Sequence, residues 1–372
     1  MNTSGEKVPR RPGPPDAARP PAPSPSPSPS PSPPPSPSPS PSPVPEAPGA
    51  RPSRTPGVRH RLRVRADVRN LSLLGVLAAL VAVGALTRPE QFLSVQNLQL
   101  VLTQASVIGV VTVGVTFVII GGGIDLSVGA MVALATVWAT TVATQEYGLG
   151  GILLCTLLVG LGCGLVNGLL VSFGGMVPFV ATLAMLAAAR GLALQISQGG
   201  TQIVSVAPVL ELGRRDAYVL GVPPIVLVFA AVTVTGLLLL NRTTFGRRTV
   251  AVGGNPEAAR LAGIDVRRQR LLLYLLSGLC CGIAAFLLIV LTGSGQNTNG
   301  NLYELDAIAA AIIGGTLLSG GRGTVTGSVL GVLVFTTITN LFALNNLETA
   351  VQQIAKGAII VVAVLVQKGH KP

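Results

Sequence analysis

The hydrophobic positions of this chain gather into long apolar runs that are separated by short polar stretches. From Leu71 to Val366 the runs recur too densely for a water-facing surface to form between them. A helix that crosses the hydrocarbon of a bilayer needs roughly 20 apolar residues. The pattern predicts ten spans, at residues 71–87, 98–120, 125–143, 151–171, 178–197, 222–240, 271–291, 305–321, 324–343 and 351–367. The third and eighth are short or interrupted by glycine, so each is a candidate for a broken or re-entrant crossing.

The composition supports a bilayer as the solvent. Only 11% of the residues are charged and 49% are hydrophobic, whereas a soluble domain carries about 25% charged residues. The net charge of +12 does not indicate nucleic-acid binding, because aromatic residues make up only 4% and no basic stripe is interleaved with them. We therefore expect an all-α polytopic membrane protein with a weak internal repeat.

Residues 1–70 form a different segment, dominated by PSPSPSPSPSPPPSPSPSPSPVP. Alternating proline prevents both helix and sheet, so this tail is expected to be disordered or extended. It has no apolar core and is not a signal peptide. A solvated tail and a proline-rich docking ligand both remain open. The stretch RHRLRVRADVR at its end favours a cytoplasmic anchor at the first span.

The distribution of charge predicts the orientation of the spans. With the N-terminus inside, the loop at 241–270 and the end at 368–372 are also inside, and both are basic. The outside connections carry most of the acidic residues. We assign Glu304 and Asp306 to one of these outside connections. The predicted organisation is a cytoplasmic tail at 1–70, a membrane domain at 71–367 and a cytoplasmic C-terminus at 368–372.

Several kinds of chemistry are excluded by the residues present. No lysine follows a GxxxxG run, so the chain has no phosphate-binding loop and cannot hydrolyse nucleotides by itself. His60 and His370 both lie in the tails, and no GxSxG or HExxH pattern occurs, so neither a catalytic site nor a metal site is expected within the spans. The cysteines all lie inside apolar runs and are expected to be unpaired core residues: Cys155, Cys163, Cys280 and Cys281.

Glycine patterns suggest close packing and a repeat. The segment at 317–333 aligns with that at 119–135, so that three glycines coincide in each. Two stripes at helical spacing are expected to let helices approach closely in lipid. These stripes are Gly160, Gly164 and Gly168, and Gly323, Gly327 and Gly331.

The inside loop contains a predicted short helix. Gly253 and Gly254 precede Asn255 and Pro256, which suit the cap and the first helical position. A helix from Glu257 is then expected to end at Gly263. Such a helix is too small to be a domain but suits a groove of another protein. An ordinary inside loop is the alternative.

Four motifs together resemble the permease subunit of ribose-type ABC importers, a family of binding-protein-dependent inner-membrane components. They are IIGGGIDLSVG, GLVNGLLVSFGGMVPFVATLAMLAAARGLAL, GGNPEAARLAGIDVRRQRLLLYLLSG and IAAAIIGGTLLSGGRGTVTGSVLGVLVFTTITN, and the likeness is collinear over about 70–367. The resemblance implies a sugar or sugar-like solute and a transport subunit that is not an enzyme.

The resemblance also implies partners. These are a separate ATPase subunit that carries ATP and Mg, an external sugar-binding protein, and a second permease that is either identical or similar. No cofactor is expected on this chain. The loop helix would couple it to the ATPase through Asn255, Glu257, Ala258, Ala259 and Gly263. The alternatives are a branched-chain amino-acid permease, an ion-coupled carrier, and a structural or receptor protein. A carrier needs clustered ionisable groups in the membrane, and we find only Asp125.

Asp125 itself has three interpretations. It could cap a helix at the inside end of the second span, line the solute path or a gate, or relay protons. The neutral or aromatic groups expected nearest the path are Gln104, Asn167, Phe179 and Gln296. Arg190 lies well inside a span, and we expect it to snorkel or to pair with a polar group near the outer face.

Overall fold

The computed structural model describes residues 58–214, 217–219 and 221–368. Within them the fold is helical apart from one antiparallel pair of two-residue strands, β1 (Gln202–Ile203) and β2 (Ser294–Gly295). The long helices are α1 (Val58–Thr87), α3 (Val95–Ile120), α6 (Gly148–Ser172), α7 (Pro178–Ser197), α9 (Pro224–Arg242), α12 (Val266–Thr292), α14 (Val325–Leu344) and α15 (Thr349–Lys368). The shorter helices are α2 (Pro89–Phe92), α4 (Val128–Ala139), α5 (Val142–Gln145), α8 (Ala207–Leu212), α10 (Thr244–Gly254), α11 (Pro256–Leu261) and α13 (Tyr303–Ile313).

The prediction of an all-α polytopic membrane protein is confirmed, and each predicted span overlaps one of these helices. In the described part, seven helices are long and apolar enough to cross a membrane, and α15 contributes a shorter apolar stretch. The span 178–197 coincides with α7. Helix α1 begins at Val58, within the stretch that the sequence analysis assigned to the tail. The rest of that predicted tail, residues 1–57, lies outside the described residues.

The third and eighth crossings are only partly helical, as their glycines suggested. Helix α4 has 12 residues and α13 has 11. The remainder of each crossing is non-helical chain, at 121–127 before α4 and at 314–324 after α13. Both non-helical segments contain glycines with positive φ, for example Gly122 at +79° and Gly320 at +82°. Such backbone favours glycine, because a Cβ atom is strained there.

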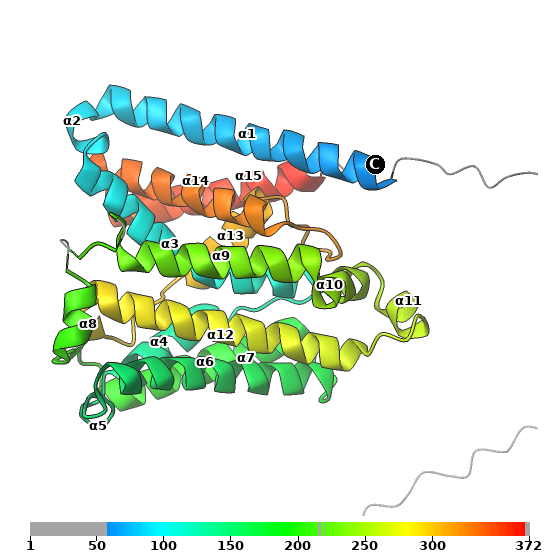
Figure 1. The fold of residues 1–372 in the computed structure, drawn as a ribbon, viewed down its shortest axis with the longest axis horizontal. Helices are drawn as coiled ribbons and strands as arrows, with labels where there is room; N and C mark the ends of the chain where they lie inside the picture. The colour runs from blue at the N-terminus through cyan, green and yellow to red at the C-terminus, as the bar shows by residue number, and fades with distance from the viewer. Residues whose placement is uncertain (1–57, 215–216, 220, 369–372) are drawn as a thin grey trace, which may run out of the picture. The chain divides into compact units, whose positions relative to one another are not determined.

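Helices α3 and α12 lie at the centre of the bundle (Figure 1). Their most apolar windows are 83% and 61% buried, against 11% for α1 and 22% for α9. The predicted close packing at glycine stripes is confirmed. A Cβ atom on Gly164 would overlap the backbone of Tyr274 in α12, and one on Gly331 would overlap Ala310 in α13. Without those Cβ atoms the helices pack backbone to backbone, as small residues allow in lipid.

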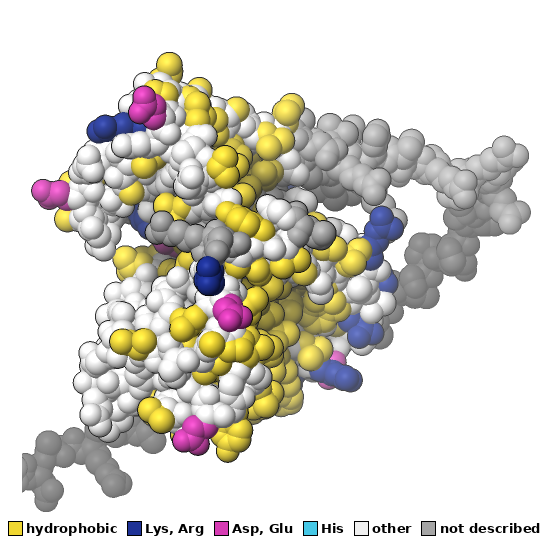
Figure 2. All heavy atoms as spheres, turned by 60° about the vertical axis from the view of Figure 1, so that its left-hand side comes forward, with side chains coloured by type: hydrophobic (Ala, Val, Ile, Leu, Met, Phe, Trp, Pro, Cys, Tyr) yellow, Lys and Arg dark blue, Asp and Glu magenta, His cyan; other side chains and the backbone are white. Residues whose placement is uncertain are grey.

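One end of the bundle carries α10 and α11, and the opposite end carries α5 and α8 (Figure 1). Figure 2 shows basic side chains gathered at the first end, acidic ones mainly toward the other, and hydrophobic side chains between them. The basic residues in the segment of α10, α11 and the start of α12 are all arginines: Arg247, Arg248, Arg260, Arg267, Arg268 and Arg270. This separation of charge is the pattern expected of a membrane protein with its basic end in the cytoplasm.

Candidate functional site

Asp125 lies at the centre of a buried polar cluster between the crossings. Its Oδ1 accepts hydrogen bonds from the backbone N–H of Ser127 at 3.0 Å and from the Ser127 hydroxyl at 2.6 Å. Its Oδ2 accepts from the hydroxyl of Ser277, near the middle of α12, at 2.9 Å. Asp125 is 1% exposed, and both serines are fully buried. The carboxyl group is therefore satisfied by protein rather than by water.

Two further helices join this cluster. The side-chain amide of Asn167 on α6 donates to the Ser127 hydroxyl at 2.8 Å. The carbonyl oxygen of Ile124 accepts from Thr182 on α7 at 3.3 Å and from the Tyr274 hydroxyl on α12 at 3.4 Å. The non-helical segment before α4 is thus held by α6, α7 and α12, which compensates for its missing helical hydrogen bonds.

The geometry refines the interpretation of Asp125 as a helix cap. Ser127, not Asp125, is the N-cap residue of α4, and Asp125 accepts the N–H of that cap residue. Asp125 also lies opposite the middle of α12, instead of at the inside end of the second span. The signal for Ser277 and Tyr274 was present in the sequence as isolated polar groups in an apolar span, but nothing in it linked them to Asp125.

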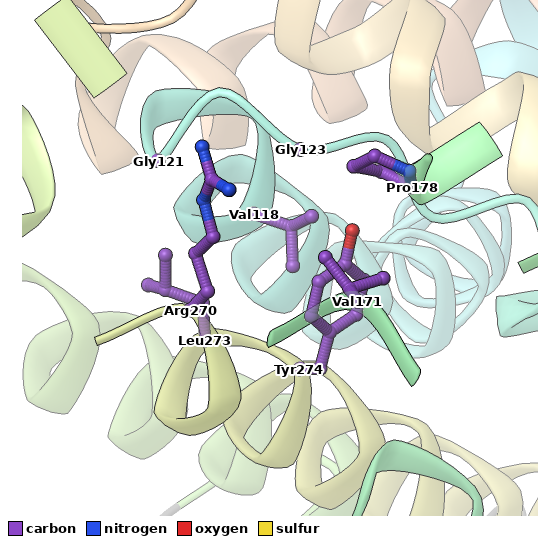
Figure 3. A pocket seen from close by; sticks show the side chains of 8 residues that line it. All are labelled: Val118, Gly121, Gly123, Val171, Pro178, Arg270, Leu273 and Tyr274. Atoms are coloured by element: carbon purple, nitrogen blue, oxygen red, sulfur yellow. The ribbon is translucent and has the colours of Figure 1, made fainter. Parts of the chain in front are cut away.

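A small cavity adjoins the cluster on the side of α10 and α11. It is lined by Val118, Gly121, Gly123, Val171, Pro178, Arg270, Leu273 and Tyr274 and has a volume of about 10 Å³. In Figure 3 the Arg270 side chain extends from α12 toward Gly121, and the Tyr274 hydroxyl points toward the chain segment that contains Gly123. This volume holds about one water molecule, so the cavity is too small for a sugar.

Helix α11 has the predicted geometry. Asn255 caps it by accepting from the backbone N–H groups of Glu257 and Ala258, each at 3.0 Å. It ends at Leu261, and Gly263, two residues later, has a φ of +79° and donates its N–H to the Arg260 carbonyl oxygen. Most of α11 is exposed, and Leu261 is 84% exposed at its tip. A large apolar side chain projecting from a rigid, capped turn suits a hydrophobic contact with another protein.

Helix α10 was missed by the sequence analysis, and it anchors α11 to the bundle. Its residue Thr249 accepts a hydrogen bond from the Gln269 amide of α12 at 2.8 Å. The ring of Phe245 lies 6.1 Å, centroid to centroid, from that of Phe117 on α3. The loop that carries α11 is therefore attached to both central helices and does not hang free of them.

Three glycine segments meet where α10 ends. An added Cβ atom on Gly253 would overlap the carbonyl oxygen of Ile120, at the end of α3. A Cβ atom on Gly321 would lie 2.7 Å from the Cα of Gly254, and one on Gly320 would lie 2.9 Å from the Cα of Gly122. The two segments of the proposed repeat therefore contact each other and the α11 loop through backbone alone. We call these residues, 121–123, 253–254 and 320–321, the glycine junction.

The residues expected near a solute path fall in different places. Asp125 and Asn167 are brought together through Ser127. Gln104 lines a separate cavity of about 230 Å³ beside α14 and α15. Phe179 is 48% exposed at the start of α7, and Gln296 lies in the loop before α13, where it accepts from Thr298 at 3.3 Å.

Arg190 pairs with polar groups as expected. Its Nη1 donates to the carbonyl oxygens of Asn297 at 2.6 Å and Asn299 at 3.0 Å. These residues lie in the loop that follows β2, and Asn299 also donates to Thr136 of α4 at 3.2 Å. Arg190 thus holds this loop against α4 and α7.

The statement that Asp125 is the only ionisable group buried in the membrane region is wrong. Asp306, which we assigned to an outside connection, lies in α13 and is buried, and its Oδ2 is 3.1 Å from Nζ of Lys356 on α15. The predicted span 305–321 already contained Asp306, but its charge led us to count it with the outside connection, because the sequence does not show that Lys356 pairs with it. The two charges offset each other, which lowers the cost of burying either one.

The family model described as "Branched-chain amino acid transport system / permease component" matches residues 97–364, which cover α3 to most of α15. The chain belongs to this permease family. A permease component is a transport subunit and not an enzyme, so this member is a multi-pass membrane transport protein.

Named relatives extend the comparison. The chain is 40% identical over 301 residues to the ribose import permease protein RbsC of Bacillus subtilis, covering 78% of this chain and 90% of the relative. It is 34% identical over 306 residues to the RbsC of Escherichia coli K12, covering 81% and 93%. It is 32% identical over 365 residues to the xylose transport system permease protein XylH of the same strain, again covering 81% and 93%. No solved structure matches the chain significantly.

These matches confirm the resemblance to the permease subunit of ribose-type ABC importers, from which the sequence analysis derived partners and coupling residues. They do not address individual residues. The roles of Asn255, Glu257, Ala258, Ala259 and Gly263 in coupling therefore stay predictions, as does any contact of the path residues with a solute.

Proposed function

We propose that this chain is the membrane permease of an ABC importer that carries a monosaccharide inward. The observation that carries the proposal is the capped, exposed helix α11, fixed through α10 to the two central helices. The position of α11 suits contact with a partner protein that changes shape. Because α11 is rigidly attached through α10, a partner that moves α11 would also move α3 and α12.

Sugar is favoured as the solute by the names of the relatives, which are ribose and xylose permeases. The description of the family mentions branched-chain amino acids, so such a permease is the second candidate. The full-length relatives at 32–40% identity favour the sugar. An ion-coupled carrier has no support among them.

The partners in this proposal are an ATPase subunit that binds ATP and Mg, an external sugar-binding protein, and a second permease that is a copy or a paralogue. The chain itself holds no cofactor. It lies in the bacterial plasma membrane with both termini and α11 on the cytoplasmic side, where the arginines around α10 and α11 agree with the positive-inside pattern.

The test is reconstitution of the chain with its ATPase and binding protein in nanodiscs. We expect D-ribose or D-xylose, with the loaded binding protein, to stimulate ATP hydrolysis. Glu257→Ala and Gly263→Pro should abolish that stimulation without removing the chain from the membrane. Gly263→Pro removes a donor and demands a negative φ where the backbone has +79°.

A matched control is Glu146→Ala, which changes an exposed glutamate beside α5 at the opposite end of the bundle. It should leave stimulation intact. If leucine rather than either sugar stimulates hydrolysis, the second candidate replaces the first. If both α11 variants stay fully coupled, the lever role of α11 is refuted.

A further inference from the structure

A cavity of about 230 Å³ lies apart from the Asp125 cluster and is bordered by α3, α12, α13, α14 and α15. It is lined by Gln104, Val107, Ile108, Leu291, Tyr303, Phe335, Thr336, Thr339 and Lys356. Small-molecule sites usually occupy roughly 300–1,000 Å³, so this cavity suits a small solute. It is far larger than the cavity of about 10 Å³ beside Tyr274.

The polar groups that line it are mostly without partners in the protein. Within the described residues, Thr336 Oγ1 is buried and makes no hydrogen bond. The side chains of Gln104 and Tyr303 make none either. A buried hydroxyl without a partner costs free energy, and natural proteins seldom keep one unless a ligand or water satisfies it.

The charges at the cavity offset each other. Lys356 Nζ lies 3.1 Å from Asp306 Oδ2 and 5.1 Å from the centre of the Phe335 ring. An ammonium group has three N–H donors, so it can serve the carboxylate and still donate to a ligand oxygen. Because the charges of Lys356 and Asp306 cancel, the cavity carries no net charge that would attract an ionic solute.

The remaining walls are aromatic or aliphatic. The aromatic rings of Phe335 and Tyr303 line it, and Val107, Ile108 and Leu291 complete the lining. Neutral amide and hydroxyl groups beside aromatic rings are the chemistry that matches a neutral polyol, which has hydroxyls at its edges and C–H groups on its faces.

We infer that this cavity is a binding site for a neutral monosaccharide inside a single permease chain, where the solute pauses during passage. The inference rests on the proposed function and adds a location to it. Binding there is weak, because a transport site that held its solute tightly would slow release.

The test uses the complete complex with its ATPase and binding protein in nanodiscs, with all four native cysteines replaced by serine or alanine. Thr339→Cys places a thiol in the cavity. Thr103→Cys is the matched control, because Thr103 precedes Gln104 on α3, is also partly buried and does not line the cavity. The rate of modification by a small hydrophilic thiosulfonate is measured with and without millimolar D-ribose or D-xylose.

We expect the transported sugar to slow modification at position 339 and not at 103. Thr336→Val, added to Thr339→Cys, should raise the half-protecting sugar concentration about fivefold, the effect of losing one hydrogen bond. Thr337→Val should change it less than twofold, because the Thr337 hydroxyl bonds to the Leu333 carbonyl oxygen of its own helix.

Uptake by the same preparations separates the two proposals. If sugar is imported but protects neither cysteine, or protects both equally, the cavity is not the site. The inference is also overturned if the cysteine at position 339 never reacts. It is likewise overturned if Thr336→Val and Thr337→Val change the half-protecting sugar concentration equally. If no sugar is imported or stimulates hydrolysis, the proposed function fails and this inference falls with it.

Discussion

Asn97 and Asn340 form a reciprocal pair of side-chain hydrogen bonds between the start of α3 and the end of α14. Asn97 Nδ2 donates to Asn340 Oδ1 at 3.2 Å, and Asn340 Nδ2 donates to Asn97 Oδ1 at 2.8 Å. Both residues are buried, at 8% and 4% exposed. Each amide therefore satisfies the other where water and lipid cannot.

This pair predicts a clear mutational cycle. Asn97→Leu or Asn340→Leu alone should destabilise the chain by about 1–3 kcal/mol, because each removes a hydrogen-bond partner of the other amide, although Asn97 Nδ2 keeps the Phe92 carbonyl oxygen at 3.1 Å. The double variant should cost less than the sum of the two. Thermal unfolding of the purified chain in nanodiscs measures all three. Strict additivity would show that the two amides do not depend on each other.

The Asp125 cluster predicts a loss of stability when its acceptor is removed. Asp125→Ala leaves the hydroxyls of Ser127 and Ser277 and one buried N–H without their acceptor, which should cost about 1–3 kcal/mol. Asp125→Asn keeps the shape and one oxygen and should cost less. Thermal unfolding measures both variants.

The same variants distinguish the interpretations of Asp125. A structural role predicts that transport falls in step with the melting temperature. If Asp125→Asn melts like the wild type but raises the sugar concentration needed for uptake, Asp125 contacts the solute. If wild-type uptake responds to a proton gradient and Asp125→Asn, while melting like the wild type, loses that response, the relay interpretation is supported.

The glycine junction predicts that methyl groups are not tolerated there. Gly253→Ala should destabilise the chain by about 1–3 kcal/mol through overpacking against Ile120 and should lower the sugar imported per ATP hydrolysed. Uptake and hydrolysis in nanodiscs measure the ratio.

Gly162→Ala is the matched control for this substitution. Gly162 is also helical, but nothing lies within 4 Å of an added Cβ atom there. Alanine should be neutral or stabilise α6 by about 0.5–1 kcal/mol. An unchanged ratio in Gly253→Ala would mean that the junction transmits no movement from α11.

The Lys356–Asp306 pair predicts an asymmetry between single and double replacement. Lys356→Met or Asp306→Asn alone leaves one charge without its partner and should cost about 3–5 kcal/mol. The double variant, which removes both charges, should recover most of that loss. Denaturation of the three variants under matched conditions measures it, and a double variant as unstable as the worse single one would contradict the pairing.

Much of the fold followed from the sequence because lipid imposes strong rules. Apolar runs of about 20 residues predicted the positions of the spans. The turn residues around Asn255 and Gly263 predicted α11. Asp306 was misplaced, although the predicted span 305–321 included it, because no local pattern shows that its carboxylate pairs with Lys356 on another helix. The partners of Asp125 and the cavity around Thr336 depend on contacts between distant helices, which no local pattern reports.

The partly helical third and eighth crossings bear on how this protein is made. The apolar helices α4 and α13 are too short to enter a bilayer alone, and their extended backbone cannot be left against acyl chains. The helices that pack on them are α6, α7 and α12 around α4, and α3 and α14 around α13, and these must therefore be in place before either segment settles. Biogenesis consequently has a late, post-insertion stage, and a chain truncated before α12 would leave α4 without the helix that satisfies Asp125.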